Sequence, residues 1–228
     1  FTPGGPRLEY QYFSTYHWHT TPDGYSGFIP PKHGQIVYEM ERFPSERSVS
    51  LLQALDVRYA IVHGNRYPPA RWSEMQMALG QAGDLDLVQA FGPDLVYRVQ
   101  PRWFEPDELD IYGHLPAQAQ AGEPYTAYVI VRNLGPRSYA VQPTEQIEPS
   151  FQWQGQATPP GGQLTAGVPL VISPDGGAAV ISLSLPAPAD RGTYELAIGE
   201  DSGLLGSWSA VGGVSAGDES ETAFPVPA

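Results

Sequence analysis

The residues best suited to chemistry lie near the start of the chain, in the segment Ser-Thr-Tyr-His-Trp-His at positions 14–19. His17 and His19 are two positions apart, so on a strand both imidazoles lie on one face and Trp18 lies on the other. Such a pair can supply two ligands to a zinc ion, which then needs a third protein ligand and a water molecule. The candidates for the third ligand are Asp23, His33 and His63. The alternative is a structural pair, hydrogen-bonded to neighbouring hydroxyl groups.

A glycine-flanked serine follows this segment and is a weaker candidate for chemistry. Ser26 stands between Tyr25 and Gly27, but the chain lacks the preceding Gly-x spacing and the strand-to-helix elbow that expose a nucleophilic serine. The pattern favours a hairpin strand with a bulge. Tyr25 and Ser26 are therefore candidate binding residues on that strand rather than catalytic residues.

His63 is a candidate binding residue because of its place at the end of a predicted strand. It follows the apolar run at 59–62 and precedes Gly64. Open α/β sheets place ligands at the carboxyl ends of their strands, so His63 can line a polar pocket together with His17 and Tyr25. The alternative is a histidine that is hydrogen-bonded at the strand end and binds nothing.

Aromatic side chains offer a second kind of chemistry, the binding of sugars. Sugar rings present apolar C–H patches that stack on the faces of Trp and Tyr. Trp72 and Met75 also have the helical spacing of core residues, so packing is the competing interpretation. The aromatic residues available for stacking are Tyr12, Tyr16, Trp18, Tyr25, Tyr67 and Trp72.

The elements that position these residues are of mixed type in the first half of the chain. Pro-Asp-Gly at 22–24 predicts a turn, and helical or alternating spacing predicts the rest. The predicted strands are 12–19, 25–29, 59–62, 85–91 and 95–99, and the predicted helices are 33–42, one capped by Ser45, and one with Pro68 and Pro69 in its first turn. This order predicts an α/β or α+β domain over residues 1–103.

The second half of the chain predicts an all-β domain. Short alternating runs recur between turn signals such as Pro-Asp-Gly-Gly at 174–177. The predicted strands are 108–114, 125–132, 147–154, 167–172, 178–185, 193–198 and 206–211. About seven short strands indicate an immunoglobulin-like sandwich over 104–214, with Trp153, Tyr194 and Trp208 inside. The acidic residues at 215–228 predict a loose tail.

Composition excludes several classes of function. The formal net charge of −13 argues against binding to nucleic acid or to an anionic lipid surface. The absence of cysteine excludes disulfides, thiolate metal sites and a cysteine nucleophile. No run of about 18 apolar residues exists, so we expect no direct membrane insertion. The chain starts at Phe1 without a signal-peptide pattern, which favours a fragment of a longer protein.

Residues 10–99 resemble the soluble extracytoplasmic portion of bacterial multi-spanning membrane glycosyltransferases of the dolichyl-phosphate-mannose-dependent (GT-C-like) type. The matching segments are Ser-Thr-Tyr-His-Trp at 14–18, Gly-Tyr-Ser-Gly-Phe at 24–28, Pro-Pro at 30–31, Phe-Pro at 43–44 and Val-Arg-Tyr-Ala-Ile-Val-His at 57–63. Asp23 departs from the Asn expected before Gly24, and either residue suits the turn. The resemblance implies a location outside the membrane, periplasmic or at the cell surface, with the catalytic carboxylate elsewhere in the parent protein.

Together these observations predict a non-catalytic accessory or binding region of a membrane glycosyltransferase-like protein, without a cofactor. Its expected partners are a saccharide acceptor and the membrane-spanning half of its own protein, with no nucleic acid. The expected contact surface comprises His17, Trp18, His19, Tyr25, Ser26 and His63. The alternatives are a stand-alone metal-dependent hydrolase that uses His17, His19 and His63, and a purely structural module of the cell envelope.

Overall fold

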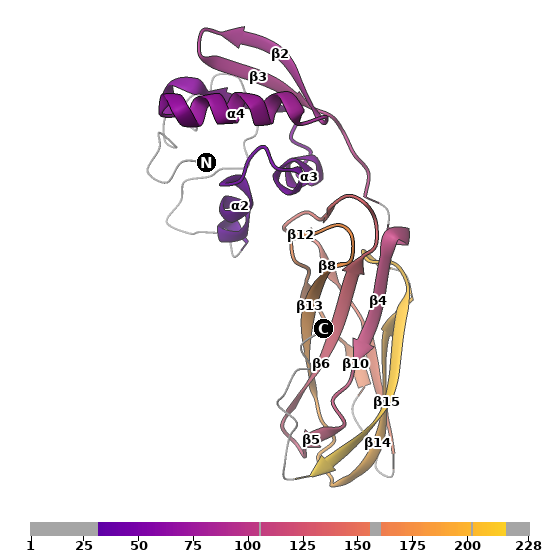
Figure 1. The fold of residues 1–228 in the computed structure, drawn as a ribbon. Coiled ribbons are helices and arrows are strands. Elements are labelled where there is room, and N and C mark those ends of the chain that lie inside the picture. Colours follow the sequence, from indigo (N-terminus) through magenta and orange to yellow (C-terminus); the bar gives the residue numbers. More distant parts are fainter. Residues whose placement is uncertain (1–31, 105, 156–160, 202, 218–228) are drawn as a thin grey trace, which may run out of the picture. The chain divides into compact units, whose positions relative to one another are not determined.

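The computed structural model describes residues 32–104, 106–155, 161–201 and 203–217 (Figure 1). The chain divides into two compact units. Unit 1 comprises Phe1–Phe104 with Ser138–Pro143, and unit 2 comprises Glu105–Arg137 with Thr144–Ala228. Among the described residues, no helix combines the length and the apolar character needed to cross a membrane.

Unit 1 is an α/β unit, as the sequence predicts. Its elements are α2 (His33–Met40), α3 (Glu46–Ala54), β1 (Tyr59–His63), the short 3-10 helix η1 (Gly64–Arg66), α4 (Pro69–Gln81), β2 (Leu85–Phe91), β3 (Asp94–Val99) and β7 (Tyr139–Ala140). The hairpin expected at 12–29 lies outside the described residues.

The helices of unit 1 begin where local chemistry favours them. The Ser45 hydroxyl caps α3 by accepting a hydrogen bond from the Ser48 N–H at 3.3 Å. Pro69 occupies the first turn of α4, where no N–H partner is needed. The apolar side chains of Val49, Leu51 and Leu52 on α3 are buried and form part of the core.

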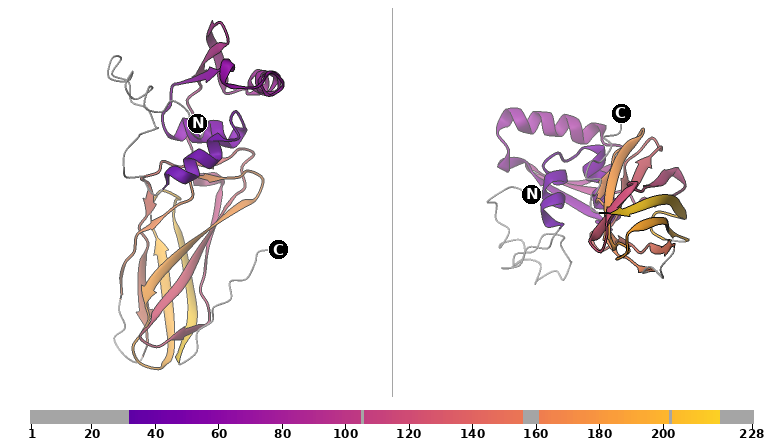
Figure 2. Two further views of the ribbon diagram at one scale, coloured as in Figure 1. Left: turned by 90° about the vertical axis from the view of Figure 1, so that its left-hand side faces the viewer. Right: turned by 90° about the horizontal axis from the view of Figure 1, so that it is seen from below.

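Three of the strands of unit 1 form an antiparallel sheet in the order β1-β3-β2. Alternation along the strands places Val62 and Tyr97 on a buried face, while Tyr59 and Ile61 lie on the opposite, exposed face. The ribbon views place α4 on one side of this sheet (Figures 1 and 2). Among the described residues, α4 and this sheet form two packed layers.

Unit 2 is almost entirely β, as the sequence predicts, but its strands at 118–120 and 161–163 were not predicted, and the predicted strands 147–154 and 167–172 are each divided in two. The strands of unit 2 are β4 (Leu109–His114), β5 (Gln118–Gln120), β6 (Pro124–Asn133), β8 (Gln146–Ile147), β9 (Ser150–Gln154), β10 (Gly161–Gln163), β11 (Ala166–Gly167), β12 (Val171–Ile172), β13 (Gly177–Pro186), β14 (Gly192–Glu200) and β15 (Trp208–Gly217), with the 3-10 helix η2 (Pro106–Glu108) before them. The last strand continues past the predicted end at 211, because the register of β14 against β15 pairs Thr193 with Ser215.

Two sheets make an immunoglobulin-like sandwich in unit 2. One has the order β10-β9-β14-β15-β5 and the other the order β13-β6-β4. All their pairs are antiparallel except the parallel pair of β15 with β5. The pairing of Ile181 with Val129 and of Leu183 with Ala127 puts buried residues on the inner face.

Trp153 on β9 lies at the centre of this sandwich, with 1% of its surface exposed. Its ring meets Tyr125 of the facing sheet edge-on at 5.5 Å and Tyr194 of its own sheet at 6.4 Å. Its indole N–H donates to the Pro186 carbonyl at 2.9 Å, which satisfies the one polar group of a buried tryptophan. The prediction that Trp153, Tyr194 and Trp208 are interior is confirmed.

Candidate functional site

Most of the site residues expected from the sequence lie outside the described residues. These are His17, Trp18, His19, Tyr25 and Ser26. Their contribution to binding, and to a metal site, stays a prediction. Within the described ranges, no three His, Asp or Glu side chains gather in a way that could hold a metal ion.

His63 lies at the carboxyl end of β1, as expected, and faces Asp94 on β3. The two residues are cross-strand partners, and His63 Nδ1 lies 3.1 Å from Asp94 Oδ2. Each side chain is about one-third exposed, at 29% and 32%. A carboxylate at Nδ1 favours the tautomer with the proton on that nitrogen and orients the ring. Sequence reasoning placed His63 correctly on the strand but did not find Asp94, because the pairing depends on the register of β3.

Gly64, directly after His63, is required by packing. Its N–H donates to the Pro93 carbonyl at 3.1 Å, and a Cβ at this position would overlap that carbonyl and the ring of Trp72. The backbone at Gly64, the first residue of η1, therefore lies closer to Trp72 of α4 than any side chain would permit.

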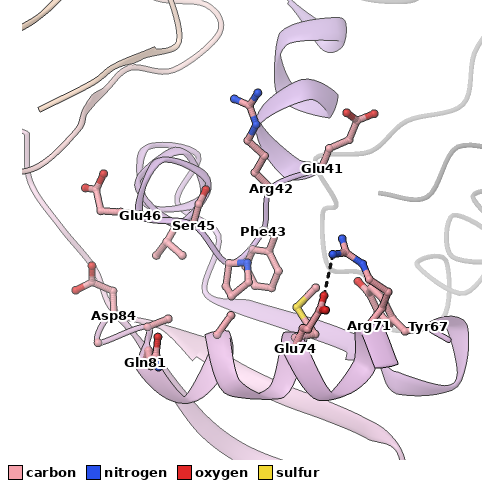
Figure 3. A pocket seen from close by; sticks show the side chains of 16 residues that line it. Glu41, Arg42, Phe43, Ser45, Glu46, Tyr67, Arg71, Glu74, Gln81 and Asp84 are labelled. Atoms are coloured by element: carbon pink, nitrogen blue, oxygen red, sulfur yellow. Dashed lines mark hydrogen bonds and ion pairs between the residues drawn. The ribbon is translucent and has the colours of Figure 1, made fainter. Parts of the chain in front are cut away.

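Unit 1 has an open pocket of about 680 Å³ between the α2–α3 corner and α4 (Figure 3). We call it the helix pocket. It is lined by Glu41, Arg42, Phe43, Pro44, Ser45, Glu46, Val49, Tyr67, Arg71, Glu74, Met75, Ala78, Gln81, Ala82, Gly83 and Asp84. Sites for small molecules typically have volumes of about 300–1,000 Å³, so this pocket has room for a ligand of that class.

A buried ion pair sets the α2–α3 corner that forms one wall of the helix pocket. Arg47 Nε donates to Glu39 Oε2 at 3.0 Å, and a second guanidinium nitrogen reaches the other carboxylate oxygen. The Glu39 side chain is only 7% exposed. Because the two residues belong to successive helices, this paired contact ties α2 to α3 across the turn at Phe43 and Pro44.

The rim of the helix pocket is polar. Arg71 and Glu74, one turn apart on α4, form an exposed ion pair at 2.9 Å, drawn as the dashed line in Figure 3. On the opposite wall, the Arg42 guanidinium lies over the Tyr38 ring at 4.4 Å, and Glu41 stands beside it. These groups offer planar donors and acceptors to a ligand with many hydroxyl groups.

The interior of the helix pocket is apolar and partly aromatic. Phe43, Val49 and Met75 line it. Tyr67, at its end, stacks on Trp72 with ring centroids 5.9 Å apart and planes 25° apart. Trp72 and Met75 are half-buried rather than fully interior, because the helix face that they share with Leu79 is covered only in part.

Glu46 lies at the end of the helix pocket, where its carboxylate is engaged by unit 1 itself. It accepts hydrogen bonds from the Ser138 N–H at 2.9 Å, from the Ser138 hydroxyl and from Ser50 at 3.0 Å, with Arg102 at 3.6 Å. Burial raises the pKa of this carboxyl, but these hydrogen bonds and the nearby charge outweigh it, so the pKa is lowered overall. These contacts favour the ionised form of the Glu46 carboxyl group and fix the position of its side chain.

Several pocket residues were missed by sequence reasoning. Tyr67 and Trp72 were named as possible sugar-stacking residues, but Arg42, Arg71 and Glu74 were not. The i, i+3 spacing of Arg71 and Glu74 on the predicted helix was a usable signal for their ion pair. No local pattern could show that this helix faces the α2–α3 corner.

Comparisons with known proteins find similarities of fold only. No protein-family model matches the chain, and no curated protein matches it. Among solved structures, the CARDB domain of the PF1109 protein from Pyrococcus furiosus, in complex with di-metal ions, is 17% identical, with 47% of this chain and 86% of that chain covered and a TM-score of 0.29.

Two further solved structures are similar over about half of this chain. A beta-glucosidase from Listeria innocua in complex with glucose is 13% identical over 48% of this chain and 16% of that chain, with a TM-score of 0.30. The ASH/PapD-like domain 7 of human CEP192 is 14% identical over 54% of this chain and 94% of that chain, with a TM-score of 0.22. The resemblance to membrane glycosyltransferases is supported by none of these and stays a prediction.

Proposed function

We propose that unit 1 is a non-catalytic saccharide-binding region and that the helix pocket is its binding site. The observation that carries this proposal is the combination, in one open pocket, of an apolar aromatic interior and a rim of planar polar groups. A sugar ring is itself two-sided, with apolar C–H faces and hydroxyl groups around its edge. Phe43 and Tyr67 suit the faces, while Arg42 and the Arg71–Glu74 pair suit the hydroxyls.

The state of two of the four pocket carboxylates, Glu46 and Glu74, supports binding rather than catalysis. Cleavage of a glycosidic bond uses a pair of carboxyl groups, one of which has a raised pKa so that it can donate a proton. The pKa of Glu46 is lowered, and its oxygens already accept hydrogen bonds from Ser138 and Ser50. Glu74 is paired with Arg71.

We further propose that the region works on the extracytoplasmic side of a bacterial membrane as part of a longer glycosyltransferase-like protein. The support is the sequence resemblance of residues 10–99. In this setting the pocket would hold the saccharide acceptor, and the membrane-spanning half of the same protein would carry out the transfer.

Two methionines on α4 provide a matched test. Met75 lines the helix pocket, whereas Met77, two residues further on, is 63% exposed and does not line it. We expect the purified chain to bind members of an array of mannose-, glucose- and galactose-containing oligosaccharides. In titration calorimetry with the best array ligand, Met75→Ala should weaken binding about 10-fold, because apolar contact is lost. Met77→Ala should leave the affinity unchanged. A silent array, or equal effects of both variants, would contradict the proposal.

One observation favours the alternative of a metal-dependent hydrolase. Histidines that bind zinc commonly donate their second ring N–H to a carboxylate, and His63 has such a contact with Asp94. Elemental analysis of the purified chain separates the two functions. Stoichiometric zinc that is lost in His63→Ala would support a site with His17 and His19, whereas a metal-free protein that binds oligosaccharides would reject it.

A further inference from the structure

The strand β1 forms one edge of the three-stranded sheet of unit 1. The strand order is β1-β3-β2, so β1 pairs with β3 on one side only within the described residues. An edge strand presents a row of backbone N–H and C=O groups to which another strand can be added. The register of β1 against β3 shows which backbone groups of β1 face the open edge.

The hydrogen bonds at the two ends of β1 identify the outward-facing backbone groups. The Arg58 carbonyl accepts from the Val99 N–H at 3.0 Å, and the Gly64 N–H donates to the Pro93 carbonyl at 3.1 Å. In an antiparallel pair, residues that bond to the partner strand alternate with residues that do not. The even-numbered residues of β1 therefore bond to β3, and the N–H and C=O groups of Tyr59 and Ile61 point to the open edge.

The side chains of the same two residues lie exposed on the face of the sheet opposite to Val62 and Tyr97. Tyr59 is 55% exposed and Ile61 is 60% exposed. The run from Tyr59 to Val62 contains no proline and no charged residue, the two devices that most often protect an edge. The other edge strand, β2, has Asp86 and an irregularity of register between Leu87 and Gln89. Only β1 offers a regular, uncharged edge among the described strands of this sheet.

We propose that a second copy of this chain docks on unit 1 along β1, antiparallel, with Ala60 opposite Ala60 of the second copy. In this register Tyr59 lies opposite Ile61 of the second copy and exchanges both backbone hydrogen bonds with it, and the two-fold axis repeats the pair. Aromatic and β-branched side chains opposite each other are a favourable cross-strand pair. The two three-stranded sheets become one continuous sheet.

The sequence of the strand fits a second copy because it is self-complementary. A two-fold axis at Ala60 brings Tyr59 against Ile61 and Ala60 against Ala60, while Val62 lies opposite Arg58, so that no two like charges oppose each other. The same axis places the outward N–H groups of each copy opposite the outward C=O groups of the other copy. This register uses only the outward groups of Tyr59 and Ile61.

Disulfide trapping tests the docking and its register, because the chain has no cysteine of its own. In the docked pair the two Ala60 residues are not hydrogen-bonded to each other, so their Cα atoms are about 4.5 Å apart. That distance lies within the range of about 4.4–6.8 Å that a disulfide spans. Oxidised Ala60→Cys should therefore run as a covalent dimer. Leu87→Cys, on the other edge strand, should stay monomeric. Absence of the Ala60→Cys dimer, or equal crosslinking of both variants, would overturn the proposal.

Sedimentation velocity of the unmodified chain, from about 1 µM to about 1 mM, should show a monomer–dimer equilibrium. Ile61→Lys places two lysines at the shared edge and should raise the dissociation constant at least about 10-fold. Leu87→Lys, at a position 56% exposed on β2, should not change it. Circular dichroism checks that both variants are folded. A chain that is monomeric throughout, or one that accepts only an extended peptide of another protein at β1, would overturn the second copy as occupant.

Discussion

At the scale of single residues, Glu46 links the pocket wall to the rest of unit 1. It is the first residue of α3, where a negative charge is favoured by the helix dipole. Its carboxylate also accepts hydrogen bonds from both the backbone and the side chain of Ser138, 92 positions further along the chain. One side chain thus contacts both the start of a helix and a distant segment. The ionisation of its carboxyl group should therefore affect the free energy of unfolding.

The lowered pKa of Glu46 predicts a loss of stability in acid. A carboxyl whose pKa is lower in the folded than in the unfolded state, here below the ordinary 4.5, stabilises the fold above that value. The contribution is lost as the pH falls through the folded pKa. Glu46→Gln should lower the free energy of unfolding by roughly 1 kcal/mol at pH 7, a value reduced by partial exposure, and by almost nothing once the carboxyl is protonated.

Chemical denaturation at several pH values measures this difference. Glu41→Gln is the matched control, since Glu41 belongs to the same corner and lines the same pocket. It should show no comparable dependence on pH. A constant difference between Glu46→Gln and the unmodified chain across the acid range would contradict the assignment.

At the scale of elements, the helix pocket exists because two short helices are held at an angle to α4. Helices of eight and nine residues are marginal on their own, so tertiary contacts must stabilise them. The Glu39–Arg47 pair is one contact that spans the corner. It is also costly to break, because the Glu39 carboxylate is buried.

Removal of one partner of this pair should destabilise unit 1 strongly. Arg47→Ala leaves the Glu39 charge buried without compensation, and we expect a loss of about 3 kcal/mol in the free energy of unfolding. Arg58→Ala breaks an exposed contact with Asp56 at 3.9 Å and should cost less than about 0.5 kcal/mol. Thermal unfolding of the two variants tests this. Equal effects would show that the corner does not depend on the buried pair.

At the scale of the whole molecule, the two units differ in charge as well as in fold. Residues 1–104 contain nine Lys or Arg and ten Asp or Glu, whereas residues 105–228 contain three and fifteen. The negative charge of the chain is therefore concentrated in the β part. This distribution favours solubility of the sandwich and opposes its contact with anionic lipid.

The separation into units predicts that the sandwich core and the helix pocket can be altered independently. Trp153→Phe removes the hydrogen bond to the Pro186 carbonyl and leaves a space beside Tyr125 and Tyr194. We expect it to destabilise unit 2 by roughly 2 kcal/mol. Oligosaccharide binding at lower temperature should be unchanged, because every residue that lines the helix pocket belongs to unit 1. Scanning calorimetry and binding assays on one sample test both expectations.

Much of the fold was predictable because it depends on local patterns. Pro69 and Ser45 mark helix starts that the structure has, and the alternation of Ile181 and Leu183 with exposed residues marks β13. The candidate site was less predictable. His63 was found at a strand end, but its partner Asp94 and the polar rim at Arg42 and Arg71 were not.

The sequence by itself determined the α/β character of the first half, the mostly-β character of the second half, and the burial of Trp153, Tyr194 and Trp208. These properties follow from the periodicity of apolar side chains and from turn residues, which act within about ten positions. Only the tertiary structure decided that α4 faces the α2–α3 corner, that Ser138 binds Glu46, and that the backbone of Tyr59 and Ile61 faces outward. Each of these depends on contacts between residues far apart in the chain, which local patterning does not encode.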